Sequence, residues 1–525
     1  MTSRMLQDLQ ARIGQDMTGF LPELILSGAI VLLLLLRFLP GMERRHLGWA
    51  ALLATGATLY TSLMQWQNLP ENASISLFSG LLVLDTFAVY IKLFLAVFAL
   101  LVVALTMMTG IPDGDDSGDF YVLLLGATLG MSIMASSNHL LMVFLGIEMA
   151  SIPSYAMAGF LKGRRQSSEA ALKYVVYGGG AAGVMLYGIS LLAGKFGTGY
   201  LPDVLSFVAA NPTDPVVLMG MLFLLIGIGF KLAAFPFHFW CPDVFEGAAA
   251  EVGAFLSVAS KGAALALLAR IAIGLAGVPN LMIPVLAVFA TVTVTFGNLA
   301  AYAQTNIKRL LAYSTIAHAG FMMMALATLR PEGAGAVLFY LAVYLVMNLG
   351  AFAVVAFIRN QTHSEDLRDL RGLVSRAPIQ VACLGVFLLS LLGIPPLGGF
   401  AAKFQVFASL FDSAQAYWAA KQNLHGNILF GLLLIGGLNT VLSLFYYVRV
   451  LKVMVLEKPI EEVEGRESTP LKVPAWQNAY VVVLSVIIVA MGLFWNQLSE
   501  ASSSRGVGTF QNRVAQAPAD QGAAK

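Results

Sequence analysis

Five lysines are assigned to the interior of long apolar stretches of this 525-residue sequence, whereas every arginine is assigned to a loop or to an end of the chain. The five lysines are Lys92, Lys173, Lys231, Lys261 and Lys403. A buried amine releases its proton more readily than one in water, whereas arginine stays charged. An ionisable side chain in mid-bilayer costs roughly 2.5–3.5 kcal/mol, so such residues normally face the interior of a helix bundle. The residue types predict groups that carry protons.

Two of these lysines adjoin strong helix breakers. Lys231 lies in GIGFKLAAFPFHFW, five residues before Pro236, and Lys403 follows Pro395 and Pro396 in LLGIPPLGGFAAKF. Proline removes a helical N–H and clashes with the preceding turn, so each apolar segment should be interrupted there. Interrupted segments at corresponding places in two halves of a transporter point to an ion site.

Glu148, in FLGIEMASIP, is interpreted as the single buried glutamate and as the counter-ion of Lys231. A nearby carboxylate would hold the lysine proton, and separation of the two groups would release it. Lys261 in SVASKGAAL and Lys403 would continue a lateral row. His318 in STIAHAGF adds a group that titrates near neutrality.

Structural interpretations stay open for all of these residues. Lys231, Lys261 or Lys403 could extend to the membrane interface from a helix end. Glu148 could be an acid that hydrogen-bonds neighbouring helices, and the pattern favours neither packing nor proton transfer for His318.

The interfacial interpretation is favoured for Lys92, and it is nearly as strong as the functional one for Lys173, which follows a basic stretch at 162–165. Glu23 and Asp85 are expected to begin helices, where a carboxylate interacts with the positive end of the helix dipole. These two acids are therefore not counted as candidate site residues.

The composition requires a membrane protein. Hydrophobic residues make up 58% of the chain and charged residues 11%, with a mean hydropathy of +0.78, whereas soluble domains are about 25% charged. Apolar runs long enough to span the bilayer predict an all-α protein with about fourteen transmembrane helices. We expect them at 20–39, 47–66, 84–109, 119–137, 139–161, 168–194, 216–234, 250–275, 281–302, 307–329, 334–358, 378–411, 427–454 and 475–497.

The interrupted segments are the seventh and the twelfth, five apart. Because five is odd, a repeated five-helix unit must be inverted in the membrane. We therefore expect N-terminal helices one to three in 1–118, a first repeat (helices four to eight) in 119–275 and a second (nine to thirteen) in 276–455. The remainder, 456–525, would hold a loop, the last helix and a tail.

Loop charges predict the orientation, since Lys and Arg concentrate on the cytoplasmic side. If the chain starts outside, seventeen cations lie on the inner side and nine on the outer side. Both termini are then periplasmic.

Several classes of chemistry lack sequence support. Cys241 and Cys383 cannot by themselves hold an iron–sulfur cluster or a zinc ion. No Walker-type loop occurs, and no basic arm indicates nucleic acid. We expect no cofactor on this chain.

The chain resembles the antiporter-like membrane subunits of proton-pumping NADH:quinone oxidoreductase, respiratory complex I, and their Mrp-type cation/proton antiporter relatives. The matching segments are LGIEMASIPSYAMAGF, GFKLAAFPFHFWCPDVFEGA, SVASKGAAL and GIPPLGGFAAKF. SSEAALKYVVYGGGAAGVMLYG, STIAHAGF and TVLSLFYYVRV are most similar to the subunit N branch of that family.

This resemblance implies that Glu148 and Lys231 form the charged pair of the input half, Lys261 the connection and Lys403 the outlet; Lys173 matches a lysine of the same pattern. It also implies that NADH, FMN, iron–sulfur clusters and quinone are handled by partner subunits, both membrane and peripheral. The expected location is the bilayer of the bacterial cytoplasmic (inner) membrane.

Two alternatives remain within the family: an Mrp-type antiporter subunit and the plastoquinone-linked photosynthetic relative. A third possibility is a structural spacer whose charges no longer move protons.

Overall fold

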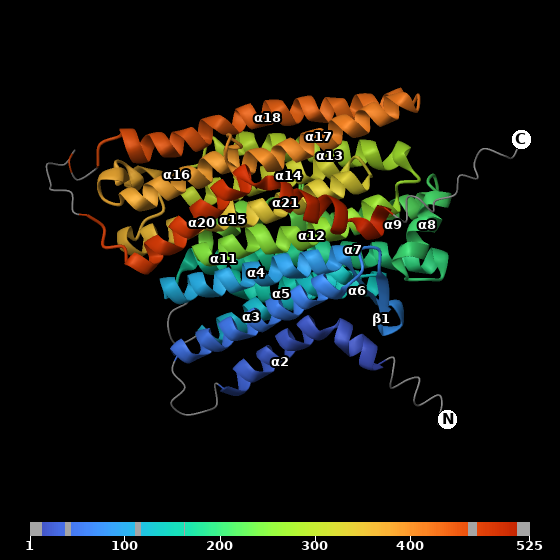
Figure 1. Ribbon diagram of the computed structural model, residues 1–525, viewed down its shortest axis with the longest axis horizontal. Helices are drawn as coiled ribbons and strands as arrows, with labels where there is room; N and C mark the ends of the chain where they lie inside the picture. Colours follow the sequence, from blue (N-terminus) through green and yellow to red (C-terminus); the bar gives the residue numbers. More distant parts are fainter. Residues whose placement is uncertain are drawn as a thin grey trace, which may run out of the picture.

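The computed structural model describes residues 13–36, 44–110, 117–161, 163–459, 462 and 470–511, which form a bundle of helices lying side by side (Figure 1). The first half contains α2 (Leu21–Leu36), α3 (Arg44–Asn68), α4 (Thr86–Thr109), α5 (Ser117–Ser136), α6 (Leu140–Ala158), α7 (Arg165–Phe196), α8 (Leu201–Ala210), α9 (Pro215–Leu232), α10 (Trp240–Gly247), α11 (Ala250–Phe255) and α12 (Lys261–Gly274). The second half contains α13 (Pro279–Ala301), α14 (Ile307–Leu326), α15 (Pro331–Thr362), α16 (Pro378–Leu392), α17 (Gly398–Ala419), α18 (Asn423–Leu456), α20 (Ala475–Leu493) and α21 (Trp495–Glu500).

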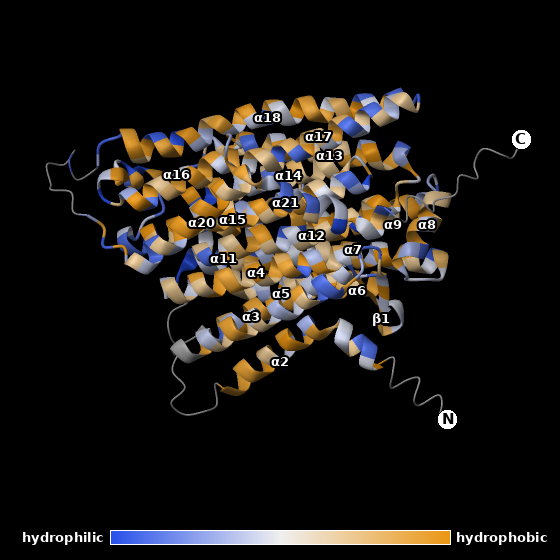
Figure 2. Cartoon of the chain, in the orientation of Figure 1, coloured by the Kyte–Doolittle hydropathy of each residue, from blue (hydrophilic) through white to orange (hydrophobic). Residues whose placement is uncertain are grey.

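The predicted all-α membrane class is confirmed, and each of the fourteen predicted segments contains a helix. Within the described residues, eleven helices are long and apolar enough to span a membrane by themselves. A twelfth span results if Ile13–Gly19 and α2, which meet at 77°, are counted together. Apolar residues cover most of the helix lengths (Figure 2), and α15 lies almost wholly inside the bundle.

Both predicted interruptions are present. α9 ends at Leu232, Ala233 adopts a left-handed conformation (φ 55°), and the chain becomes helical again at α10. α16 ends at Leu392, Gly393 is left-handed (φ 91°), and α17 begins at Gly398. The second break divides the predicted twelfth segment, 378–411, into two helices, whereas the first break ends the predicted seventh segment, 216–234, and α10 follows outside it. The boundaries of the two repeats remain predictions.

One sheet was not predicted. Strands β1 (Ser74–Leu77) and β2 (Leu82–Asp85) form an antiparallel hairpin in which Ser74 is opposite Asp85. The following helix starts at Thr86, later than predicted, because the Asp85 carboxylate accepts a hydrogen bond from the Ala88 N–H (2.8 Å) and caps it.

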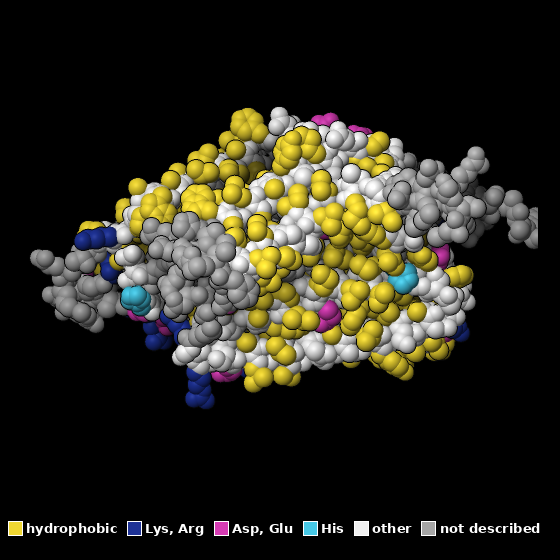
Figure 3. All heavy atoms as spheres, turned by 90° about the horizontal axis from the view of Figure 1, so that it is seen from below, with side chains coloured by type: hydrophobic (Ala, Val, Ile, Leu, Met, Phe, Trp, Pro, Cys, Tyr) yellow, Lys and Arg dark blue, Asp and Glu magenta, His cyan; other side chains and the backbone are white. Residues whose placement is uncertain are grey.

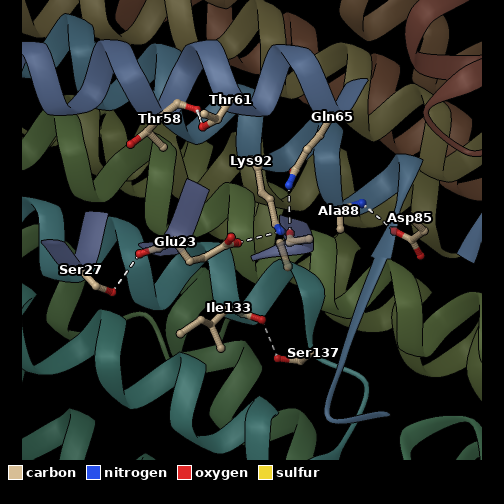
Figure 4. A network of polar contacts seen from close by, with 12 residues as sticks. Glu23, Ser27, Thr58, Thr61, Gln65, Asp85, Ala88, Lys92, Ile133 and Ser137 are labelled. Carbon is tan, nitrogen blue, oxygen red and sulfur yellow. Dashed lines mark hydrogen bonds and ion pairs between the residues drawn. The ribbon is translucent and has the colours of Figure 1, made fainter. Parts of the chain in front are cut away.

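The interfacial interpretation of Lys92 is wrong. Its side chain is buried and lies 2.7 Å from a carboxylate oxygen of Glu23, which is also buried (Figure 4). Glu23 does lie in the first turn of α2, as expected. In addition to any interaction with the dipole of α2, its carboxylate forms an ion pair with Lys92 of α4. Glu148 is therefore not the single buried glutamate.

A buried arginine also contradicts the prediction that only lysines occur inside the helices. The nine cations counted on the outer side include Arg270, yet Arg270 lies in α12 with 6% of its surface exposed. Its guanidinium donates two hydrogen bonds to Asp85 (2.7 and 2.8 Å) and one to the Ala135 carbonyl (2.9 Å). This bidentate geometry satisfies the charge and allows it to be buried.

Lys and Arg side chains gather toward one end of the bundle in the space-filling view (Figure 3). Several cations counted for the orientation lie outside the described residues: Arg4, Arg12, Arg37, Lys162, Arg466, Arg513 and Lys525.

The Glu23–Lys92 pair gives a stability prediction. Lys92→Met leaves a buried carboxylate without its cation, which costs about 3–5 kcal/mol, so the thermal unfolding temperature of the purified chain in detergent should fall clearly. The double variant Glu23→Leu/Lys92→Met removes both charges and should recover most of the loss. Equal stability of Lys92→Met and the unchanged chain would contradict a structural role for the pair.

Candidate proton-transfer site

The first helix break positions Lys231 at the carboxyl end of α9. The carbonyls freed by the break find new donors: Ala234 N–H reaches Gly229 O (2.9 Å), and Trp240 Nε1 reaches Phe230 O (2.9 Å). An ammonium group in the last turn of a helix interacts favourably with the negative end of its dipole. The break thus creates a place in the bundle interior where a lysine is tolerated.

Lys231 does not form the predicted close ion pair with Glu148. It is fully buried, and its Nζ donates to Ser151 Oγ at 3.0 Å. Ser151 is three residues after Glu148 on α6, so the two residues share one helix face. Among the described ion pairs within 4 Å, none joins Lys231 to Glu148, and Glu148 itself is only partly buried. Ser151 is therefore the direct hydrogen-bond partner of Lys231, and the role of Glu148 as its counter-ion stays a prediction.

Lys261 lies directly after a π-helical turn, Leu256–Ser260, in the middle of the α11–α12 span. Its Nζ is 3.7 Å from Cys241 Sγ, and it lies 5.8 Å from the Trp240 ring centre and 5.5 Å from that of Phe245. The ring faces offer a favourable cation–π environment. Because Trp240, Cys241 and Phe245 all belong to α10, the continuation of the broken α9, the break connects the surroundings of Lys231 and Lys261.

His318, on α14, lies at the centre of a buried group of tyrosines from α15 and α18. Its Nδ1 is 2.7 Å from the Tyr340 hydroxyl, and its Nε2 is 3.2 Å from the Tyr447 hydroxyl. Tyr447 also lies 2.5 Å from Ser314 Oγ. A neutral imidazole has one donor and one acceptor nitrogen, so it can accept a proton on one side and release one on the other.

Lys403 lies at the second break. Its Nζ donates to Leu392 O (2.8 Å), the last residue of α16, and lies 4.7 Å from the Phe321 ring centre. Phe321 follows His318 by one helical turn on α14, with 6.3 Å between their ring centres. α14 packs against both α12 and α17. It therefore joins the region of Lys261 to that of Lys403 through His318.

The structure brings Lys173 to a different place. Its Nζ contacts Asp243 (2.7 Å) and Glu169 (2.8 Å), and Arg309 contacts Asp243 (2.6 Å) and Glu246 (2.7 Å). These side chains line a hollow of about 200 Å³ that is open to the surface. Lys173 thus belongs to a half-exposed ionic cluster and not to the buried row.

Sequence reasoning missed the neutral partners of the row: Ser151, Cys241, Tyr340 and Tyr447. The spacing of Ser151 from Glu148 and the position of Cys241 just after the break were visible signals. The two tyrosines gave none, because they lie 22 and 129 residues from the histidine that they contact. Within the described residues no three His, Cys, Asp or Glu side chains are arranged to hold a metal ion.

The second break depends on a glycine. A Cβ at Gly399 would lie 1.7 Å from the Ser390 carbonyl oxygen, so Gly399→Ala should force α16 and α17 apart and destabilise the chain by about 1–3 kcal/mol. Gly437→Ala in α18, where nothing lies within 4 Å, is the matched control and should be tolerated. Thermal unfolding in detergent measures both variants. Equal stability of the two would contradict this account of the break.

The family model described as NADH:quinone oxidoreductase/Mrp antiporter, TM matches residues 137–424. The chain is 39% identical over 511 residues to NADH-quinone oxidoreductase subunit N of Anaeromyxobacter sp., with 91% of this chain and 94% of that protein covered. It is 38% identical over 513 residues to subunit N 2 of Chloroherpeton thalassium, with 94% and 95% covered.

Among solved structures, a chain of respiratory complex I from Thermus thermophilus with bound aureothin is 33% identical, with a TM-score of 0.74 and 92% of this chain and 99% of that chain covered. A chain of the Mrp complex from Dietzia sp. shares the fold (TM-score 0.82, 95% and 98% covered) at 19% identity. The resemblance predicted from the sequence motifs is confirmed: this chain belongs to the NADH:quinone oxidoreductase/Mrp antiporter transmembrane family, in its subunit N branch.

Proposed function

We propose that this chain is the proton-translocating membrane subunit of a multisubunit NADH:quinone oxidoreductase. The observation that carries the proposal is the series of buried lysines at two helix breaks, in a chain whose 39%-identical relative is a subunit N. NADH, FMN, the iron–sulfur clusters and quinone belong to partner membrane and peripheral subunits. Quinone reduction there drives the proton movement here.

The input step uses the separation between Glu148 and Lys231. Unit charges attract by about 4 kcal/mol at 4 Å with an effective dielectric constant near 20, and by about half of that at 8 Å. A helix movement that changes the distance by this amount changes the proton affinity of Lys231 by more than tenfold. The Ser151 hydroxyl holds the lysine in the separated state.

The proton then passes laterally along groups with neutral partners. Lys261, beside Cys241, takes it from the Lys231 region; His318, between two tyrosine hydroxyls, carries it across α14. Lys403, held by the Leu392 carbonyl, is the outlet. The groups that contact Lys261 and Lys403 are uncharged. Either lysine can therefore lose its proton without leaving an unpaired carboxylate beside it in the membrane.

Lys173 serves proton uptake at the surface in this proposal. The open hollow between Lys173 and Arg309 exposes the carboxylates of Glu169, Asp243 and Glu246. Asp243 of this cluster and Cys241, which contacts Lys261, lie on the same short helix, α10. A change in the protonation of the cluster can therefore act on Lys261 through α10.

The chain is a multi-pass membrane subunit. We place it in the bacterial inner membrane with both termini periplasmic. The first and last described segments support this placement, because both contact the same end of the bundle, where the β1–β2 hairpin connects α3 to α4. Gln65 Nε2 donates to Gly19 O (2.9 Å), and Thr509 Oγ1 lies 3.3 Å from Thr86 Oγ1.

The row can be tested in the assembled enzyme. Lys231→Ala should reduce proton pumping per electron several-fold in reconstituted vesicles, because the input half loses its proton-carrying amine. Lys452→Ala, which changes an exposed lysine on α18, is the control and should pump normally. Normal pumping by Lys231→Ala together with Glu148→Gln would overturn the proposed mechanism.

The antiporter alternative rests on the fold shared with the Mrp chain. It requires sodium- or potassium-dependent proton flux from this chain alone. We expect no such flux when the purified chain is reconstituted in vesicles and an internal pH indicator is followed. A cation-dependent flux that Lys231→Ala abolishes would favour the antiporter.

A further inference from the structure

A second glutamate is buried deeper than Glu148. Glu251, in the first turn of α11, is 0% exposed, and neither of its carboxylate oxygens has a hydrogen-bond partner among the described residues. The Thr109 hydroxyl interacts with Glu251, but its hydrogen bonds go to the Leu105 and Thr106 carbonyls of its own helix (3.2 and 3.3 Å). An ionised carboxylate without partners would be costly in this position, so burial favours the protonated form of Glu251.

Arg359 and Lys308 interact electrostatically with Glu251. Lys308 Nζ donates to Ala248 O (2.7 Å) and pairs with Glu365 (2.8 Å), which Arg359 also approaches (3.4 Å). Two cations and one carboxylate leave this cluster with a net charge of +1. Ionised Glu251 brings the total to zero, whereas protonated Glu251 leaves it at +1. The surrounding field thus offsets part of the cost of ionising a buried acid.

The cluster reaches toward the surface on one side. The side chain of Glu365 is 15% exposed, whereas that of Lys308 is 3% exposed. Glu365 follows α15, and its backbone carbonyl accepts a hydrogen bond from Ile307 N–H (3.0 Å). Glu365 can therefore exchange protons with the outside of the bundle, and its partner Lys308 also interacts with Glu251.

On the other side, polar groups continue from Glu251 toward Lys261 along the same span. Ten residues separate the two, about 15 Å of helix. The Ser257 hydroxyl and the Asn348 amide hydrogen-bond each other between them. Within the described part of the chain, Asn348 Oδ1 and Ser260 Oγ are buried without hydrogen-bond partners. The π turn at Leu256–Ser260 lies in this interval, and such turns occur frequently at functional sites.

We propose that Glu251 is a proton-carrying group on a second uptake branch, which leads from the Lys308–Glu365–Arg359 cluster to Lys261. Glu251 accepts a proton on a carboxylate oxygen. It then passes the proton toward the amine of Lys261 and returns to the carboxylate, which Lys308 and Arg359 stabilise. The inference rests on the proposed role of Lys261 and adds a residue that the lysine row does not contain.

The test is Glu251→Gln in the whole enzyme, reconstituted in vesicles. Glutamine keeps the size and the hydrogen-bonding capacity but cannot carry a proton, so proton pumping should fall several-fold, with thermal stability equal to or above that of the unchanged enzyme. Added azide, a small weak acid that can shuttle protons, should restore part of the rate. Glu332→Gln, at an exposed acid in the first turn of α15, is the matched control and should pump normally.

Lys261→Ala, measured in parallel, separates the two claims. If Lys261→Ala loses pumping while Glu251→Gln pumps normally, the uptake branch is wrong and the lysine row stands. If both pump normally, the proposed function itself is wrong. A loss in Glu251→Gln that azide does not restore, together with lower thermal stability, would make Glu251 a structural residue and overturn the inference.

Discussion

The apolar core of the bilayer is the constraint on which the rest of this structure depends. Water does not satisfy a polar group there, so every broken turn and every charge needs a partner within the protein. The breaks after α9 and α16 meet this requirement locally. Trp240 donates to the Phe230 carbonyl, and Lys403 donates to the Leu392 carbonyl. In the second case the group that satisfies the broken helix is also the group proposed to carry the proton.

Two kinds of buried charge follow from this constraint. Arg270 forms a bidentate ion pair with Asp85, and Lys92 forms an ion pair with Glu23. Separating either pair would leave two unpaired charges inside the protein. Lys231, Lys261 and Lys403 instead contact a hydroxyl, a thiol and a carbonyl. Neutral partners hold an ammonium group weakly and do not penalise its loss of charge. The first kind of contact fastens helices together, and the second leaves a proton free to move.

The central helices connect the two breaks. α14 contacts α10 and α12 on the side of the first break and α17 on the side of the second, and it carries His318 between them. The tyrosines of α15 and α18 hold this histidine from both ring nitrogens. A movement of either broken helix therefore reaches the histidine through side chains already in contact, which is the kind of physical connection that coupling between distant sites requires.

The sequence by itself determined the helical membrane class, the places of the helices, both breaks and the family, because hydropathy and proline act over a few neighbouring residues. It also singled out Lys231, Lys261, Lys403 and His318. Only the tertiary structure decided which side chains meet. Arg270 pairs with Asp85, 185 residues away. Lys231 donates a hydrogen bond to Ser151, and Lys173 lies in an ionic cluster at the surface. Partners so far apart in the chain are chosen by how helices pack, and that information does not lie in any local pattern.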